Sequence, residues 1–103
     1  MTAAGAEFVK LLTPEQRELT VLAYDAPVRI DWHFIPKDYR KGLQLKEMTD
    51  EQRLAAHQLL RSALSQVGYS KATRIMHLEN LLHELEGGRG RNIRDPLRYY
   101  FTV

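Results

Sequence analysis

The sequence predicts an α+β fold that is mainly helical, with a helical hairpin, a short N-terminal helix and two strands. Between residues 49 and 87, apolar residues recur three and four positions apart, as they do on one face of a helix. Over 28–35 and 97–103 the apolar period changes to two, which indicates strands. Helices and strands in separate stretches of a short chain favour an α+β arrangement around one core.

The hairpin is expected to consist of helices over about 50–67 and 71–86. Thr49, with a glutamine three residues later, has the form of a capping box and marks the start of the first helix. Gly68 can end that helix in a left-handed turn, and Ser70 can cap the second helix, which stops near the glycine after residue 86. A link this short predicts antiparallel neighbours. The apolar faces expected to pack are formed by Ala56, Leu59, Leu60, Ala63 and Val67, and by Ile75, Leu78, Leu81, Leu82 and Leu85.

A shorter helix is expected over about 14–22, because Thr13 can cap it and a proline stands at its first position. Residues up to Leu12 either extend a helix or fray. The start of this helix resembles the start of the hairpin, since 13–17 and 49–53 share threonine, glutamate, glutamine and arginine. Two interpretations are open: an internal duplication, or two independent uses of one capping solution. The second is favoured, because the similarity fades after one turn and repeat proteins usually need three or more copies.

The two predicted strands differ in how well they are bounded. The first, over about 28–35, alternates apolar residues with polar ones and ends at Pro36. The second, over about 97–103, runs to the last residue of the sequence. A lone two-stranded ribbon is marginally stable, so either more chain follows or the second strand pairs elsewhere. We therefore expect a single domain over 1–103 that is incomplete.

Composition excludes several classes of function. A net charge of +2 over 103 residues does not indicate a nucleic-acid partner. The chain has no cysteine, which excludes disulfides, thiolate metal sites and a cysteine nucleophile. Neither a secretory signal nor an apolar window long enough to cross a bilayer is present, so we expect no membrane partner and a cytoplasmic location.

The best local candidate for chemistry is the polar face of the first strand. Asp31 and His33 project to the same side, and a carboxylate beside an imidazole can orient the ring for a general base or a metal ligand. One histidine does not make a metal site, so the sequence does not identify a metal or a cofactor. The alternative interpretation is a solvated face on which Arg29 pairs with Asp31. The other histidines, at 57, 77 and 83, lack metal-binding spacing.

Candidates for ligand binding lie on both predicted strands and in the loop between the helical hairpin and the second strand. Arginines in the glycine-rich loop, Arg94 among them, could receive a phosphate or carboxylate, or could simply keep the loop soluble. Arg94 could also reach Asp31 if the strands pair. Trp32 and Tyr99 could line a pocket together with Arg29, although aromatic residues on strands more often belong to the core.

A set of spaced residues resembles a known family. They are Arg29-x-x-Trp32-x-Phe34-x-Pro36, Gly42-Leu43-x-Leu45, Leu59-Leu60, Leu64-Ser65-x-x-Gly68-Tyr69, Ile75-Met76-x-Leu78-Glu79 and Arg94-Asp95-Pro96-x-x-Tyr99-Tyr100. In this order they resemble the N-terminal part of the bacterial and fungal family called domain of unknown function 3500, over about residues 12–103. The resemblance implies that members continue past the tyrosine-rich strand into a segment with a glycine and paired histidines.

Two functions follow as expectations. The first is a hydrolase-like enzyme, which could be metal-dependent, and which the missing C-terminal part of the same domain completes. Its paired histidines would join His33 around a metal, with Arg29 or Arg94 stabilising an anion. The alternative is a non-catalytic module that binds a small-molecule ligand or a protein partner. Residues 1–103 alone show no complete set of nucleophile, base and orienting group, so no turnover is expected from them.

Overall fold

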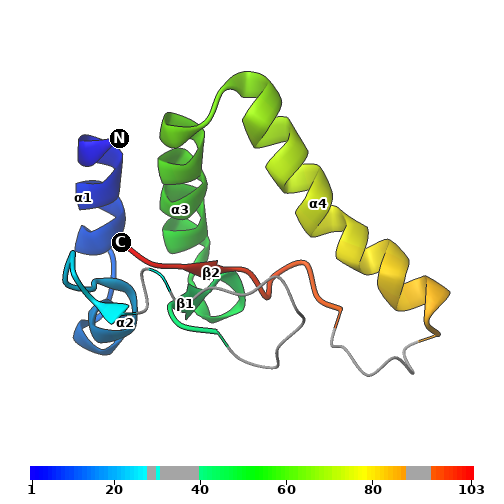
Figure 1. Ribbon diagram of the computed structural model, residues 1–103, viewed down its shortest axis with the longest axis horizontal. Helices are drawn as coiled ribbons and strands as arrows, with labels where there is room; N and C mark the ends of the chain where they lie inside the picture. The colour runs from blue at the N-terminus through cyan, green and yellow to red at the C-terminus, as the bar shows by residue number, and fades with distance from the viewer. Residues whose placement is uncertain (28–29, 31–39, 88–93) are drawn as a thin grey trace.

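A computed structural model describes residues 1–27, 30, 40–87 and 94–103, and it is mainly helical α+β, as predicted. The predicted strand at 28–35 falls, apart from Ile30, outside the described residues. The elements, in chain order, are α1 (Thr2–Lys10), α2 (Pro14–Thr20), β1 (Leu43–Gln44), the 3-10 turn η2 (Leu45–Glu47), α3 (Asp50–Ala63), α4 (Gln66–Leu85) and β2 (Tyr100–Phe101), as Figure 1 shows.

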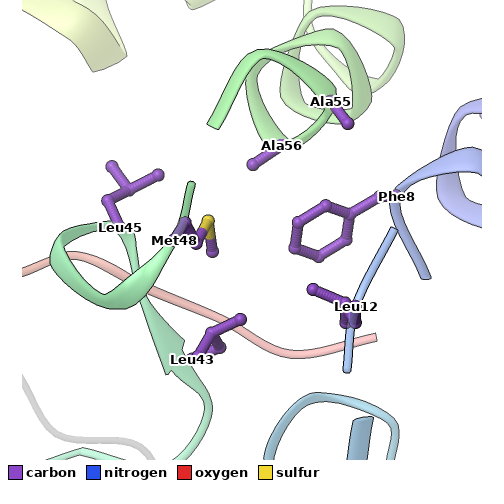
Figure 2. Packing of buried hydrophobic residues seen from close by; sticks show 7 residues of the cluster. All are labelled: Phe8, Leu12, Leu43, Leu45, Met48, Ala55 and Ala56. Atoms are coloured by element: carbon purple, nitrogen blue, oxygen red, sulfur yellow. The ribbon is translucent and has the colours of Figure 1, made fainter. Parts of the chain in front are cut away.

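The core lies where α1 packs antiparallel along α3, above the small sheet (Figure 1). Phe8 is completely buried, and Figure 2 shows its ring pointing toward Ala56 and Met48. The ring also meets Phe101 of β2, with centroids 5.9 Å apart. The sequence left two possibilities for the residues up to Leu12, a helix or a frayed end. They form a helix, α1, which supplies the centre of the core. The remaining buried apolar residues are Leu12, Leu43, Leu45 and Ala55.

The sheet forms between segments that are far apart in the sequence. β1 and β2 are antiparallel, with Leu43 opposite Phe101 and Gln44 opposite Tyr100. The second predicted strand is therefore shorter than expected, two residues in place of seven. It pairs with β1, a segment for which the sequence predicted no strand. Backbone hydrogen bonds continue beyond β2, because the amide of Val103 donates to the carbonyl of Thr20 at 2.8 Å.

The break between α3 and α4 comes earlier than the sequence suggested. The chain is extended at Leu64, and the Ser65 hydroxyl accepts a hydrogen bond from the Gly68 amide at 3.0 Å. Gly68 therefore stands in the first turn of α4 instead of ending α3, and Ser65, not Ser70, is the cap. The predicted C-terminal stop is confirmed, since Gly87 follows the helix with φ of 61°.

The two helices of the predicted hairpin are adjacent in sequence but do not pack along their length. They diverge from their short link (Figure 1), and none of the twenty residues of α4 is buried. The expected burial of Leu60 and Leu82 was wrong, because both are half-buried. The reason is that α1 occupies the apolar side of α3 that was assigned to α4. Within the described residues, no helix is long and apolar enough to span a membrane.

The two similar helix starts contact each other. Thr13 and Thr49 each form a complete capping box, with Gln16 and Gln52 as its third helical residue. The Gln52 amide donates to Oε1 of Gln16 at 2.8 Å, and the Gln16 amide donates to Oε1 of Gln52 at 3.3 Å. We call Gln16 and Gln52 the glutamine pair. Each glutamine thus closes its own cap and binds the other one.

Further contacts repeat with the same spacing of 36 residues along the chain. Arg17 donates through Nε to the carbonyl of Val9 at 3.2 Å, and Arg53 donates through Nε to the carbonyl of Leu45 at 2.8 Å. The two caps are therefore matched in their surroundings as well as their sequence, and they are not independent in space.

Candidate functional site

The structure tests only some of the site residues expected from the sequence. The catalytic candidates Asp31 and His33, and the ligand candidates Arg29 and Trp32, lie outside the described residues. Their roles stay predictions. Arg94 and Tyr99 are described, and the structure brings them together on one side of α4.

A polar cluster joins the C-terminal segment to α4. Arg94 donates to Glu86, with Nη2 3.1 Å from Oε1 and Nε 3.3 Å from the same oxygen. Its Nη1 lies 3.8 Å from a carboxylate oxygen of Glu79. The hydroxyl of Tyr99 donates to the other oxygen of Glu79 at 3.2 Å. We call these four residues the Arg94 cluster.

Electrostatics fixes the protonation states in this cluster. Hydrogen bonding to Glu86 raises the pKa of Arg94 further above its ordinary value, so the guanidinium stays charged. Burial, together with the neighbouring charge of Glu79, raises the pKa of Tyr99 to about 12. Tyr99 is therefore a neutral hydrogen-bond donor over the ordinary pH range.

The Arg94 cluster attaches the C-terminal segment to α4. It is not arranged to bind an anion, because the charge of Arg94 is already balanced. Two carboxylates flank the guanidinium, so an anionic ligand would have to displace Glu86 to bind Arg94. Sequence reasoning missed Glu79 and Glu86. The signal available for them was their spacing of seven residues, which places both on one side of a helix.

The turn after Arg94 is held in the same way. A turn spans residues 95–98, with the amide of Arg98 donating to the carbonyl of Asp95 at 3.1 Å. Lys46 contacts the Asp95 carboxylate at 2.7 Å, and this hydrogen bond lowers the pKa of Asp95 below its ordinary value. The turn is thus fixed to the residues that follow β1.

A histidine and a tyrosine meet where α3 and α4 are closest. Nδ1 of His57 lies 2.9 Å from the hydroxyl of Tyr69, and the guanidinium of Arg61 lies 5.7 Å from the centre of the Tyr69 ring. Tyr69 could not be identified from the sequence as the partner of His57. In the described part of the chain, no group of three or more metal-ligating side chains is gathered.

The outer side of α4 is apolar and exposed. Its inner side carries Met76, which packs against the core, and Glu79 and Glu86 of the Arg94 cluster. Next to these carboxylates, and turning away from the core, lies a row of large apolar residues, of which Leu82 is half-buried and the others are exposed. We call this row the outer stripe: Ile75, Leu78, Leu81, Leu82 and Leu85. Ile75 is 56% exposed and Leu85 is 72% exposed.

The fold and these clusters define a small, mainly helical α+β protein whose described polar groups hold its segments together. The family model described as "Protein of unknown function (DUF3500)" matches residues 1–103, and the chain therefore belongs to that family. No curated protein and no solved structure matches it.

Proposed function

We propose that this chain is a protein-interaction module whose outer stripe receives an apolar helix of a second polypeptide. The observation that carries the proposal is the state of α4. This helix of twenty residues buries none of them, yet it carries a continuous row of large apolar side chains on one side. A row of this kind on a folded surface is typical of a protein-binding site.

The way α4 is attached supports this role. Its inner side meets the rest of the chain through Met76, Tyr69 and the Arg94 cluster, so the outer stripe is not needed to hold the helix in place. Each apolar side chain of the stripe would contribute on the order of 1 kcal/mol to binding on losing its exposed apolar surface to a partner. Five such residues supply the centre of an interface, with charged residues at its margin.

The experiment compares the stripe with a matched polar pair on the same helix. Replacing both Leu78 and Leu81 by serine is expected to reduce binding of a dye specific for exposed apolar surface, with the melting temperature lowered no further than in the control. The control replaces His77 and Asn80, which are also exposed, by serine and leaves dye binding intact. A melting temperature that falls in the stripe variant as far as in a core variant would show that the stripe is packed within the fold.

The hydrolase-like function expected from the sequence depends on residues outside the described ranges. His33 and Asp31 stay its predicted catalytic residues, and a C-terminal part of the same domain stays its predicted partner. Metal analysis of a longer chain of the family, repeated after His33→Ala, is its test. Stoichiometric metal that disappears with the substitution supports the enzyme, and no metal in either protein contradicts it.

A further inference from the structure

We propose that α4 is a hinged helix, which opens and closes against the core as a rigid body while the Arg94 cluster holds it in the closed position. The proposal does not depend on what binds the outer stripe, because it concerns the inner side of the helix. It is carried by the geometry of the link after α3, by the small burial of α4, and by the charged contact at the far end of α4.

The link between α3 and α4 has the geometry of a hinge. Leu64 and Ser65 stand between the two helices and are both extended, with ψ of 153° and 168°. Each helix is complete on its own side of the link. The amide of Leu64 donates to the carbonyl of Leu60 in α3, and the amide of Gly68 in α4 donates to the Ser65 hydroxyl. A change of backbone angle at Leu64 therefore turns α4 without breaking helical hydrogen bonds, as hinge residues at the ends of elements do.

α4 is long but makes a small contact with the core. Twenty residues form a helix of about 30 Å. None of them is fully buried, and Met76, which packs against the core, is itself half-buried. Near the hinge, His57 of α3 meets Tyr69 at 2.9 Å, and this contact moves little when the helix turns because Tyr69 is in the first turn of α4. Opening therefore costs little apolar burial, which is the main force that holds most helices in place.

The far end of α4 is held by charge. Nη2 of Arg94 lies 3.1 Å from Glu86, which caps the helix, and Nη1 lies 3.8 Å from Glu79. The three side chains are between 20% and 29% exposed, so water and salt ions reach them. Partly exposed ion pairs are weakened by salt. The Arg94 cluster can therefore favour the closed position and still release the helix.

The segment that carries Arg94 is itself fixed to the core. The Asp95 carboxylate contacts Lys46 at 2.7 Å and accepts a hydrogen bond from the amide of Leu97 at 2.9 Å. The amide of Lys46 donates in turn to the carbonyl of Leu97, also at 2.9 Å. Figure 1 shows this stretch leading from beside α4 to the small sheet. Loss of the Arg94 contacts would therefore move α4 and leave the C-terminal segment in place.

Opening would change the surface that the chain presents. It would separate Glu79 from the Tyr99 hydroxyl, which now lie 3.2 Å apart, and lift Met76 from the core. The open state would thus show more apolar surface on the inner side of α4 while the helix itself stays folded.

A distance measurement between two spin labels tests the hinge, since the chain has no cysteine of its own. Cysteines at Glu51 in α3 and Glu84 in α4, both exposed positions, carry the labels. At low salt we expect one dominant distance. Arg94→Gln should add a second, longer distance that becomes as populated as the first, with the helix content by circular dichroism unchanged. Salt at about 1 M, where the Debye length is about 3 Å, should shift the labelled chain with Arg94 in the same direction.

Lys46→Gln is the matched control, because it removes a cation that pairs with Asp95 instead of a residue of α4. It should leave the label distances unchanged. A single unchanged distance in Arg94→Gln overturns the proposal, and so does an equal shift in Lys46→Gln. If Arg94→Gln loses helix content, Glu86→Gln decides, since it removes the main partner of Arg94 and keeps the size of the side chain. The second distance is expected there too, and its absence overturns the proposal.

Discussion

Two helical regions of this molecule carry similar apolar patterns: α1 with the start of α3, and α4. The first region buries its apolar face, whereas the second leaves most of its apolar residues exposed. Around α1 and the start of α3, helices interlock, with Phe8 buried and the glutamine pair closing both caps. In α4 apolar residues also recur at helical spacing, yet Ile75, Leu78, Leu81 and Leu85 of its stripe are exposed to solvent. Periodicity therefore predicts that a helix has an apolar face, but which neighbour covers that face is decided by the rest of the fold.

The physical difference between the two regions lies in their partners. α1 packs on the apolar side of α3, and Leu43 of β1 lies in the same buried cluster as Ala55 and Ala56 of α3. α4 receives a few polar contacts on its inner side, and these hold it without burying its leucines. The first region should therefore dominate the stability of the isolated chain.

Phe8→Ala should give the largest loss, about 3–5 kcal/mol in the free energy of unfolding, because it removes a fully buried aromatic ring from the core. The matched change in the other region, Leu78→Ala, should cost less than about 0.5 kcal/mol, since that side chain is half exposed. Denaturant titrations of both variants measure the contrast. Equal losses would show that α4 is as well packed as α1, and the distinction between the regions would fail.

Gln52→Ala should give the next largest loss, about 2–4 kcal/mol in the free energy of unfolding. The side chain is only 4% exposed, and besides its bonds to Gln16 and Thr49 it donates to the carbonyl of Leu11 at 2.8 Å. Alanine removes the cap and leaves buried polar groups without partners. Thermal unfolding measures the effect. The control is Glu51→Ala, which changes an exposed neighbouring residue.

The glutamine pair can be dissected further by a double-mutant cycle. If the two caps support each other, Gln16→Ala and Gln52→Ala together should cost less than the sum of the single losses, with a coupling of about 0.5–3 kcal/mol. Additive losses would mean that the caps act separately.

The local parts of this fold could be predicted from the sequence. The caps at Thr13 and Thr49 and the stop at Gly87 depend on residues within one helical turn, and each was found correctly. The boundary at Ser65 was missed because a serine cap and a glycine three residues later compete as signals for the same break.

The long-range parts could not be predicted in the same way. Nothing near Phe8 indicates that α1 takes the place beside α3, and nothing near Leu43 indicates that β2 pairs with it. Arg94 and Tyr99 were singled out for their chemistry, but their partners depend on how α4 lies against the C-terminal segment. A pattern of residue types carries no such information about a neighbour distant in sequence.

Gly42→Ala should cost about 1–3 kcal/mol, a smaller effect in the well-packed region. Gly42 has φ of 111°, and a Cβ there would lie 2.6 Å from the carbonyl oxygen of Phe101. The loss should appear in denaturant titration together with weaker amide protection around β1. Gly87→Ala is the comparison, because that glycine also has a positive φ but no atom near its Cβ position. Equal losses would mean that the close approach of β2 contributes nothing.

Raising the pH should loosen the attachment of α4. Because the pKa of Tyr99 is raised to about 12 in the fold, against about 10 in the unfolded chain, the stabilising difference is fully present below pH 10. It should be lost as the pH rises from 10 to 12. Ultraviolet titration should show a late-ionising tyrosine whose signal disappears in Tyr99→Phe. A late tyrosine that persists in Tyr99→Phe would assign the shift to another residue.

Gly5→Ala should give the smallest change, a gain of about 0.5–1 kcal/mol. Gly5 lies within α1, where glycine is less favourable than alanine because the unfolded chain has more backbone freedom to lose. A Cβ at this position would lie 3.7 Å from Cδ1 of Leu59, which is ordinary contact distance across the α1–α3 interface. The gain therefore requires that α1 be a formed helix against α3 in solution. A loss of stability, measured by thermal unfolding, would mean that the two helices approach more closely than this geometry allows.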